Sequence, residues 1–187
     1  MSTSSDTRTA APALVAGTWA IDPAHSEVSF AIRHLMGKVR GSFTEFSGQV
    51  EIGDPVENST ATADIQIASI DTRNGDRDNH IRSAEILDLD NHPAIRFAST
   101  GVRVHGDTAT VHGELTVRGV AKPVTLGVEF NGTGTDPWGG TRAGFTATTT
   151  VNRKDFGVEF NVPLQGEAVL LGDKVDITLE VQAVLQS

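Results

Sequence analysis

The chain has 187 residues, a formal net charge of −9 and no cysteine. The negative charge and the lack of a basic stripe argue against nucleic-acid binding, and the missing cysteines exclude disulfides, thiolate nucleophiles and cysteine-ligated metals. No apolar run approaches the roughly 18 residues that a membrane-spanning helix needs. The length predicts one domain with a tail. We do not expect the chain to span a membrane.

The first segment, residues 1–17, is rich in Ser, Thr and Ala and predicts a disordered tail before a single domain at 18–187. A secretory signal needs a basic start and an apolar stretch of about 7–15 residues. Here Asp6 and Arg8 cancel, and Pro12 interrupts the short apolar stretch. We therefore expect a cytoplasmic protein, or an exported one if the true start lies upstream.

Most of the remaining chain alternates between apolar and polar residues, which is typical of half-buried β-strands. The alternating segments are 28–34, 64–67, 95–98, 111–118, 124–131, 145–151 and 175–182. Segments near Trp19 and across 39–52 bring the expected total to eight or nine strands. Turn signals such as Asn131-Gly132 separate them, so neighbouring strands should pair antiparallel.

A single short helix is predicted, within residues 77–88, which is too little to cover the apolar face of so large a sheet. The sheet must therefore pack on itself as a sandwich or a barrel, and long strands joined by hairpins favour an up-and-down barrel. An eight-stranded barrel is either filled by side chains or holds one small ligand. Its expected inward face mixes large residues, such as Phe30 and Phe97, with small ones, such as Gly113 and Ala147, which favours a cavity.

The predicted helix carries Arg77, Asp78, His80 and Arg82 within six positions. Asp78 and Arg82 are spaced to pair along a helix. Two interpretations of the cluster stay open. Arg77 or His80 could hold an oxygen-bearing ligand at the barrel mouth, or the whole cluster could dock the helix on the rim.

The histidines do not predict a metal site, because no HxH or HExxH spacing occurs. His25 follows a turn signal and should form a hydrogen bond within that turn. His34 shares a strand face with Phe30 and Ile32, so it should point inward, as a satisfied core group or as a donor to a ligand. No arrangement of nucleophile, base and oxyanion hole is present, and we predict no catalytic residue.

Several separated motifs resemble the YceI-like family of lipocalin-like polyisoprenoid-binding proteins. The most recognisable is Arg77-Asp78-Asn79-His80-Ile81-Arg82-Ser83, followed by Leu87-Asp88 and His92-Pro93. Further matching segments are 19–26, 28–30, 41–43, 46–48, 68–72, 95–97, 113–120 and 152–158. They occur in the family's order over about residues 18–185. The chain departs from the family at Ile86-Leu87, where members often carry a paired aromatic, and we expect it to lack the export signal of many members.

The resemblance implies an eight-stranded antiparallel barrel, lipocalin-like and all-β, with one short helix near its mouth. It implies non-catalytic binding, carriage or sequestration of a long-chain isoprenoid, of the prenylated quinone or polyprenyl phosphate type, with no cofactor and no metal. A homodimer is possible. The candidate ligand-binding residues are Phe30, Ile32, His34, Phe43, Phe46, Ile65, Ile67, Arg77, His80, Ile81, Ile86, Leu87, Phe97, Leu115, Phe145 and Phe156.

Two alternatives remain. The first is a barrel enzyme of the isomerase or cyclase type that acts on a hydrophobic substrate, with His34 or Arg77 as the titrating group. The second is a stress or interaction protein whose barrel is fully packed and holds no ligand.

Overall fold

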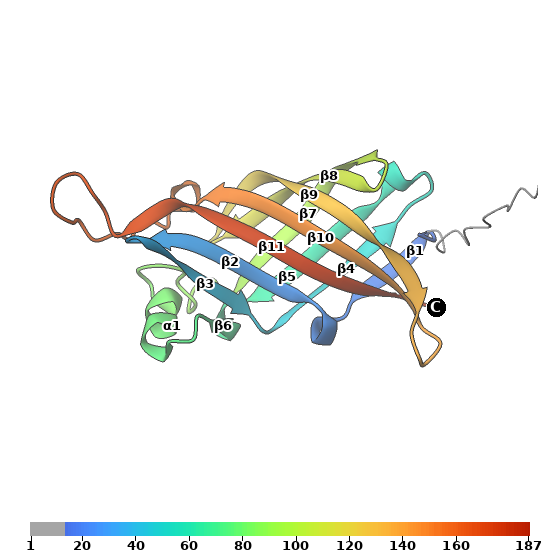
Figure 1. Cartoon of the computed structure of the whole chain (residues 1–187), viewed down its shortest axis with the longest axis horizontal. Helices are drawn as coiled ribbons and strands as arrows, with labels where there is room; N and C mark the ends of the chain where they lie inside the picture. The colour runs from blue at the N-terminus through green and yellow to red at the C-terminus, as the bar shows by residue number, and fades with distance from the viewer. Residues whose placement is uncertain (1–13) are drawn as a thin grey trace, which may run out of the picture.

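The computed structural model describes residues 14–187, which form eleven strand segments and one α-helix (Figure 1). The strands are β1 (Gly17–Ile21), β2 (Glu27–His34), β3 (Gly37–Phe43), β4 (Phe46–Ile52), β5 (Thr60–Gln66), β6 (Ile70–Asp71), β7 (Ala94–His105), β8 (Thr108–Val117), β9 (Val120–Thr135), β10 (Thr141–Asn152) and β11 (Leu171–Leu185). The helix is α1 (Gly75–Arg82), and the 3-10 turns are η1 (Pro23–His25), η2 (Val56–Asn58), η3 (Ile67–Ser69) and η4 (Arg153–Phe156). Residues 1–13 of the predicted tail lie outside the described residues.

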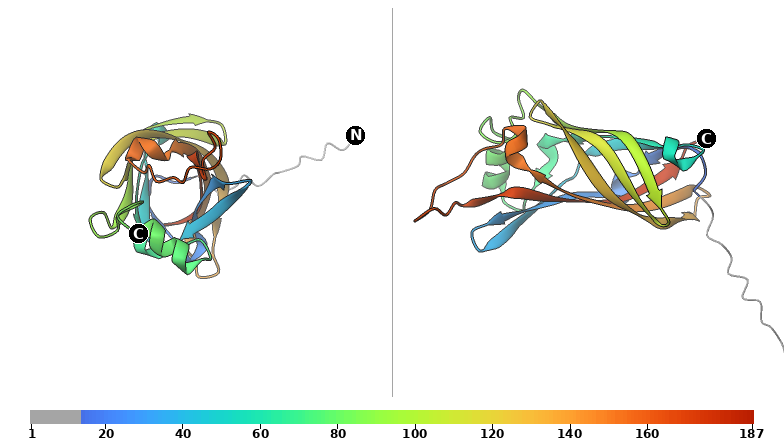
Figure 2. Two further views of the ribbon diagram at one scale, coloured as in Figure 1. Left: turned by 90° about the vertical axis from the view of Figure 1, so that its left-hand side faces the viewer. Right: turned by 90° about the horizontal axis from the view of Figure 1, so that it is seen from above.

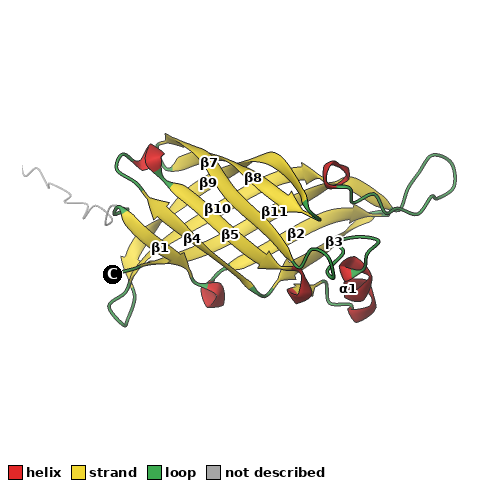
Figure 3. Ribbon diagram, turned by 180° about the vertical axis from the view of Figure 1, so that it is seen from behind, coloured by secondary structure: helices red, strands yellow, loops and turns green. Residues whose placement is uncertain are grey.

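The strands close into an antiparallel barrel of eight members. Going round the wall, the order is β1, β4, β5, β7, β8, β9, β10 and β11, and β11 pairs with β1 to complete the ring. Strands dominate both long sides, and the helical turns lie at the ends and at strand junctions (Figure 3). The fold class predicted from the alternating pattern is therefore confirmed.

Towards the α1 end, the shorter strands continue the same wall. The first part of β11 pairs with β2, and every residue of β3 pairs with β2. β6 joins β3 through only two residue pairs, Ser42 with Asp71 and Phe43 with Ile70. In the part of the chain that the structure describes, β6 has no ladder with β7. The wall is thus interrupted beside α1, and the end-on view shows this helix at the rim of the barrel (Figure 2).

The helix is shorter than predicted and begins earlier. The Asn74 carboxamide oxygen accepts a hydrogen bond from the Arg77 backbone N–H at 3.0 Å, which caps the first turn. The prediction of helix beyond Arg82 is wrong, because Ser83 is extended and Asp88 has a φ of 55°. The chain turns back on the helix instead, and the Leu87 N–H donates to the Ile81 carbonyl at 3.0 Å.

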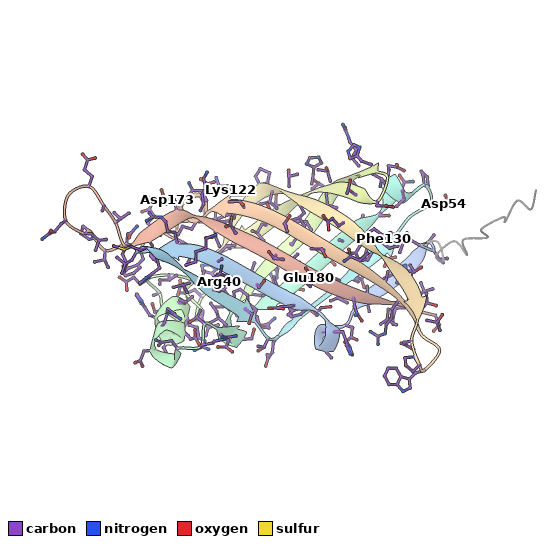
Figure 4. All side chains as sticks on the ribbon, in the orientation of Figure 1. Arg40, Asp54, Lys122, Phe130, Asp173 and Glu180 are labelled. Carbon is purple, nitrogen blue, oxygen red and sulfur yellow. The ribbon has the colours of Figure 1, made fainter. Side chains whose placement is uncertain are left out.

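Trp19 occupies the other end of the barrel. Its side chain is fully buried against Ile52, Ala143 and Ala183, which come from three different strands of the wall. The indole N–H donates to the Val15 carbonyl at 3.0 Å, so this polar group is satisfied. Trp19 therefore fills the space between β1, β4, β10 and β11 at this end of the barrel. Charged side chains cover the outside of the wall, as at Arg40 and Glu180 (Figure 4).

An ion-pair network links three segments at the β1 end. Arg142 Nη1 lies 2.7 Å from Asp22 Oδ2, and its Nε lies 2.9 Å from Asp136 Oδ2. Asp22 also contacts His25 Nδ1 at 2.8 Å, which confirms the hydrogen bond predicted within that turn. Hydrogen bonds from Arg142 and then His25 lower the pKa of Asp22 to about 2.

This network predicts how stability responds to acid. Asp22 has a lower pKa in the folded protein than its usual 3.8, so the folded state favours its charged form. The contribution is complete above about pH 4 and is lost as the pH falls towards about 2. We expect the stability difference between wild type and Asp22→Asn, measured by urea unfolding, to shrink over this window. The exposed Asp90→Asn should differ little from wild type throughout; a difference for Asp22→Asn that stays constant would contradict the assignment.

No helix among the described residues is both long enough and apolar enough to cross a membrane.

Candidate ligand-binding lumen

The barrel encloses two adjoining apolar chambers. The first has a volume of about 430 Å³ and extends from the middle of the barrel to the α1 end. The second has a volume of about 300 Å³ and extends towards the turn between β7 and β8. The volume of the first chamber lies within the usual range of small-molecule sites, and the volume of the second lies at the lower bound of that range. The packed-barrel alternative required a lumen without such space, so these chambers argue against it.

The first chamber is walled almost entirely by aliphatic and phenyl side chains. The polar residues that line it are Ser29, His34, Arg77, His80, Thr149 and Arg153. Four of these carry a ring nitrogen or a guanidinium, and they come from the end of β2, from α1 and from η4. A lumen that is apolar along its length and polar at the α1 end matches an amphiphile, since the tail needs no hydrogen-bond partners.

His34 ends β2 and pairs across the ladders with Gly37 and Leu171. Its side chain is half-buried and lines the first chamber, as the alternation predicted. Among the described residues its ring has no hydrogen-bond partner. A half-buried imidazole with both nitrogens unused is available to a polar group that enters the chamber.

Arg77 and Asp78 dock the helix on Thr72. Arg77 donates from Nε to the Thr72 hydroxyl at 2.8 Å and from Nη2 to the Thr72 carbonyl at 2.6 Å. Asp78 is 7% exposed and accepts from the Thr72 N–H at 2.9 Å and from its hydroxyl at 2.6 Å. These contacts agree with the docking interpretation of the cluster. A ligand contact by Arg77 stays a prediction.

His80 and Arg82 also contact the protein itself. His80 Nε2 lies 2.7 Å from Glu85 Oε2, and its ring meets the Phe160 ring edge-on with centroids 4.6 Å apart. Arg82 donates to the Ala68 and Ile70 carbonyls, each at 3.2 Å. The predicted pairing of Arg82 with Asp78 is not formed, because Asp78 turns inward to Thr72.

Arg153 lies at the polar α1 end of the first chamber, which is the mouth of the barrel. The sequence pattern did not single it out. It is 6% exposed and donates to three carbonyl oxygens, those of Gly172, Val158 and Phe160, each at 2.8 Å. Burial lowers the pKa of Arg153, and the nearby negative charge of Asp173 acts in the other direction and raises it. Its Nη2 makes no hydrogen bond and lies 3.8 Å from the Asp173 carboxylate. Its position in the matching segment 152–158 was the only signal in the sequence.

The structure gathers nearly all of the candidate residues in one place. The first chamber is lined by Phe30, Ile32, His34, Phe43, Phe46, Ile65, Arg77, His80, Ile81, Ile86, Leu87, Phe97, Leu115 and Phe156. Phe145 lines the second chamber instead. Ile67 lines neither: it sits in η3, where the chain leaves β5, and is fully buried in the wall.

Nowhere in residues 14–187 do three or more His, Asp or Glu side chains converge in a way that could hold a metal ion.

A closed eight-stranded antiparallel barrel with an apolar lumen and a helix at one end defines a lipocalin-like barrel protein. Residues 19–183 match the model of the YceI-like domain, and the chain belongs to this family. Curated relatives named UPF0312 protein include one from Pseudomonas putida, 45% identical over 72% of each chain. Another, from Azotobacter vinelandii, is 39% identical and covers 87% of this chain and 83% of its own.

Solved structures share the fold. BcnA from Burkholderia cenocepacia superposes with a TM-score of 0.77 at 23% identity, over 87% of this chain and 98% of its own. A polyisoprenoid binding domain from Saccharophagus degradans, described as implicated in plant cell wall breakdown, gives a TM-score of 0.67 at 14% identity. That match covers 92% of this chain and all of the other. At these identities the likeness shows the fold alone.

Proposed function

We propose that the protein binds a long-chain isoprenoid or a similar amphiphilic lipid in its lumen, for carriage or sequestration, without catalysis. The observation that carries this proposal is the first chamber, about 430 Å³ of apolar space with its charged groups gathered at one end. Family membership supports it, since a neighbour of the same fold is described as polyisoprenoid binding.

The energetics of such binding are favourable. Apolar surface removed from water gains about 25 cal/mol per Å², so burying about 600 Å² of a prenyl tail gains roughly 15 kcal/mol before ordering and association costs. The walls bind a tail without needing hydrogen bonds. Affinity then comes from the tail, and the polar mouth orients the molecule.

The polar end of the ligand is proposed to lie beside His34, with Arg77 and His80 near it. A prenylated quinone or a polyprenyl phosphate offers oxygen acceptors that suit an imidazole N–H or a guanidinium. His34 is the best placed of the three, because Arg77 and His80 already have protein partners.

Native mass spectrometry of the freshly purified protein, followed by organic extraction of the same sample, tests the proposal. We expect a stoichiometric amphiphile with a long apolar tail. A protein that is purified empty, and stays empty when offered prenylated quinones and polyprenyl phosphates, would refute it.

The role of His34 has its own test. We expect His34→Leu to weaken binding of a prenylated quinone by about twofold to tenfold, since a hydrogen bond contributes about 0.5–1.5 kcal/mol. The hydrocarbon squalene has no polar end, so its binding should change little. His105→Leu, at an exposed position outside both chambers, is the matched control. Equal losses for quinone and squalene would show that His34 only shapes the chamber.

The cytoplasmic location and the possible homodimer are also part of the proposal. Cell fractionation with an antibody and analytical ultracentrifugation test them.

A further inference from the structure

The two chambers adjoin at a ring of side chains that line both of them, which we name the waist. Its members line both chambers and come from five different strands. They are Ile21, Ala63, Phe97, Leu126, Leu179 and Val181. A chain that passes from one chamber to the other must therefore pass these six residues, of which Phe97 is the largest.

Glycines let two side chains of the waist, those of Phe97 and Ile21, lie against the wall. A Cβ at Gly113 would stand 2.4 Å from two carbons of the Phe97 ring, so this ring rests directly on β8. A Cβ at Gly48 would stand 2.5 Å from the Thr62 carbonyl oxygen and 2.9 Å from the Ile21 side-chain tip. Such separations are far below ordinary contact, so both side chains depend on having glycine beneath them.

The two glycines lie at the level of the waist. Along β8, Leu115 lines the first chamber and Val111 the second, with Gly113 between them. Along β4, Phe46 lines the first chamber and Val50 the second, with Gly48 between them. The opening between the chambers is therefore set by how flat Phe97 and Ile21 lie on these two glycines.

We propose that the waist selects ligands by tail length, with Phe97 on Gly113 as the specificity-determining contact. A short tail is held in the first chamber alone, and a long tail threads the waist and fills the second chamber as well. This inference rests on the proposed function, and it adds the class of ligand: a lipid whose tail is longer than the first chamber.

The test compares a short and a long prenyl alcohol, farnesol with three isoprene units and solanesol with nine, delivered from the same detergent. Gly113→Ala forces the Phe97 ring off the wall and into the waist. The new Cβ would also stand 2.8 Å from the Ala98 carbonyl oxygen, so Leu126→Phe is made as a second narrowing variant that leaves the backbone alone. Phe97→Leu widens the waist. Gly127→Ala, whose Cβ would meet nothing closer than 3.8 Å, is the matched control.

We expect both narrowing variants to bind solanesol at least tenfold more weakly than wild type, with farnesol within about twofold. Phe97→Leu should keep solanesol binding. Equal losses for both alcohols in Leu126→Phe, or no loss for either, would overturn the role of the waist. If wild type binds neither alcohol nor any other prenyl lipid, the proposed function itself fails. The wild-type titration distinguishes this outcome from a failure of the waist alone.

Discussion

Trp19→Ala is expected to lower the free energy of unfolding by about 3–5 kcal/mol, the usual cost of removing a fully buried large aromatic side chain. Trp19 is 0% exposed and packs on Ile52, Ala143 and Ala183, so its removal leaves a cavity where three strands meet. For a domain of this length each kcal/mol shifts Tm by about 2–4 °C. Urea and thermal unfolding followed by circular dichroism measure the effect.

The chain supplies a matched control in its second tryptophan. Trp138 lies in the turn between β9 and β10 and is 83% exposed. Trp138→Ala should change stability by no more than about 0.5 kcal/mol, as is usual for exposed positions. A similar loss in both variants would mean that Trp19 does not anchor the β1 end of the barrel.

Arg153→Met is expected to cost about 2–4 kcal/mol and to weaken lipid binding at the same time. The carbonyls of Gly172, Val158 and Phe160 lose their donor, and a buried carbonyl without a partner costs about 1–3 kcal/mol where water cannot replace it. Val158 and Phe160 line the first chamber, so loosening them alters the mouth. Unfolding by urea and a titration with a prenylated quinone give the two readouts.

Arg96→Met is the control for the loss of a charged side chain. Arg96 contacts Asp64 at 3.1 Å and is 71% exposed, and such surface pairs contribute between about 0 and 1 kcal/mol. Neither stability nor binding should change appreciably. If Arg153→Met behaves like Arg96→Met, the three carbonyl contacts do not hold the mouth together.

The barrel was predictable because its strands face water on one side and the lumen on the other. Alternation therefore shows which residues point inward, and Phe30, Ile32 and His34 do line the chamber. Alternation fails where a strand ends early. Ile67 continues the pattern of β5, but the chain turns into η3 at this residue, and its side chain enters the wall.

The mouth was only partly predictable. The charged helix was recognisable in the sequence. How many hydrogen bonds each of these side chains makes, however, depends on segments elsewhere in the chain. Arg77 and Asp78 both meet Thr72, whereas Arg153 meets carbonyls up to 19 residues away. No local spacing encodes such contacts, so the sequence could not separate docking residues from those left free for a ligand.

The interruption of the wall between β6 and β7 leaves one side of β3 open. Its residues 37–41 pair with β2 but have no ladder on the other side within the described chain. Open strand edges invite edge-to-edge aggregation, and natural proteins counter this with charged residues along the edge. Lys38 and Arg40 are exposed there, and Figure 4 shows Arg40 on the outside of the wall. Lys38 contacts the Asp176 carboxylate at 3.7 Å, and the charge of Arg40 opposes the addition of a further strand to the open edge beside the helix.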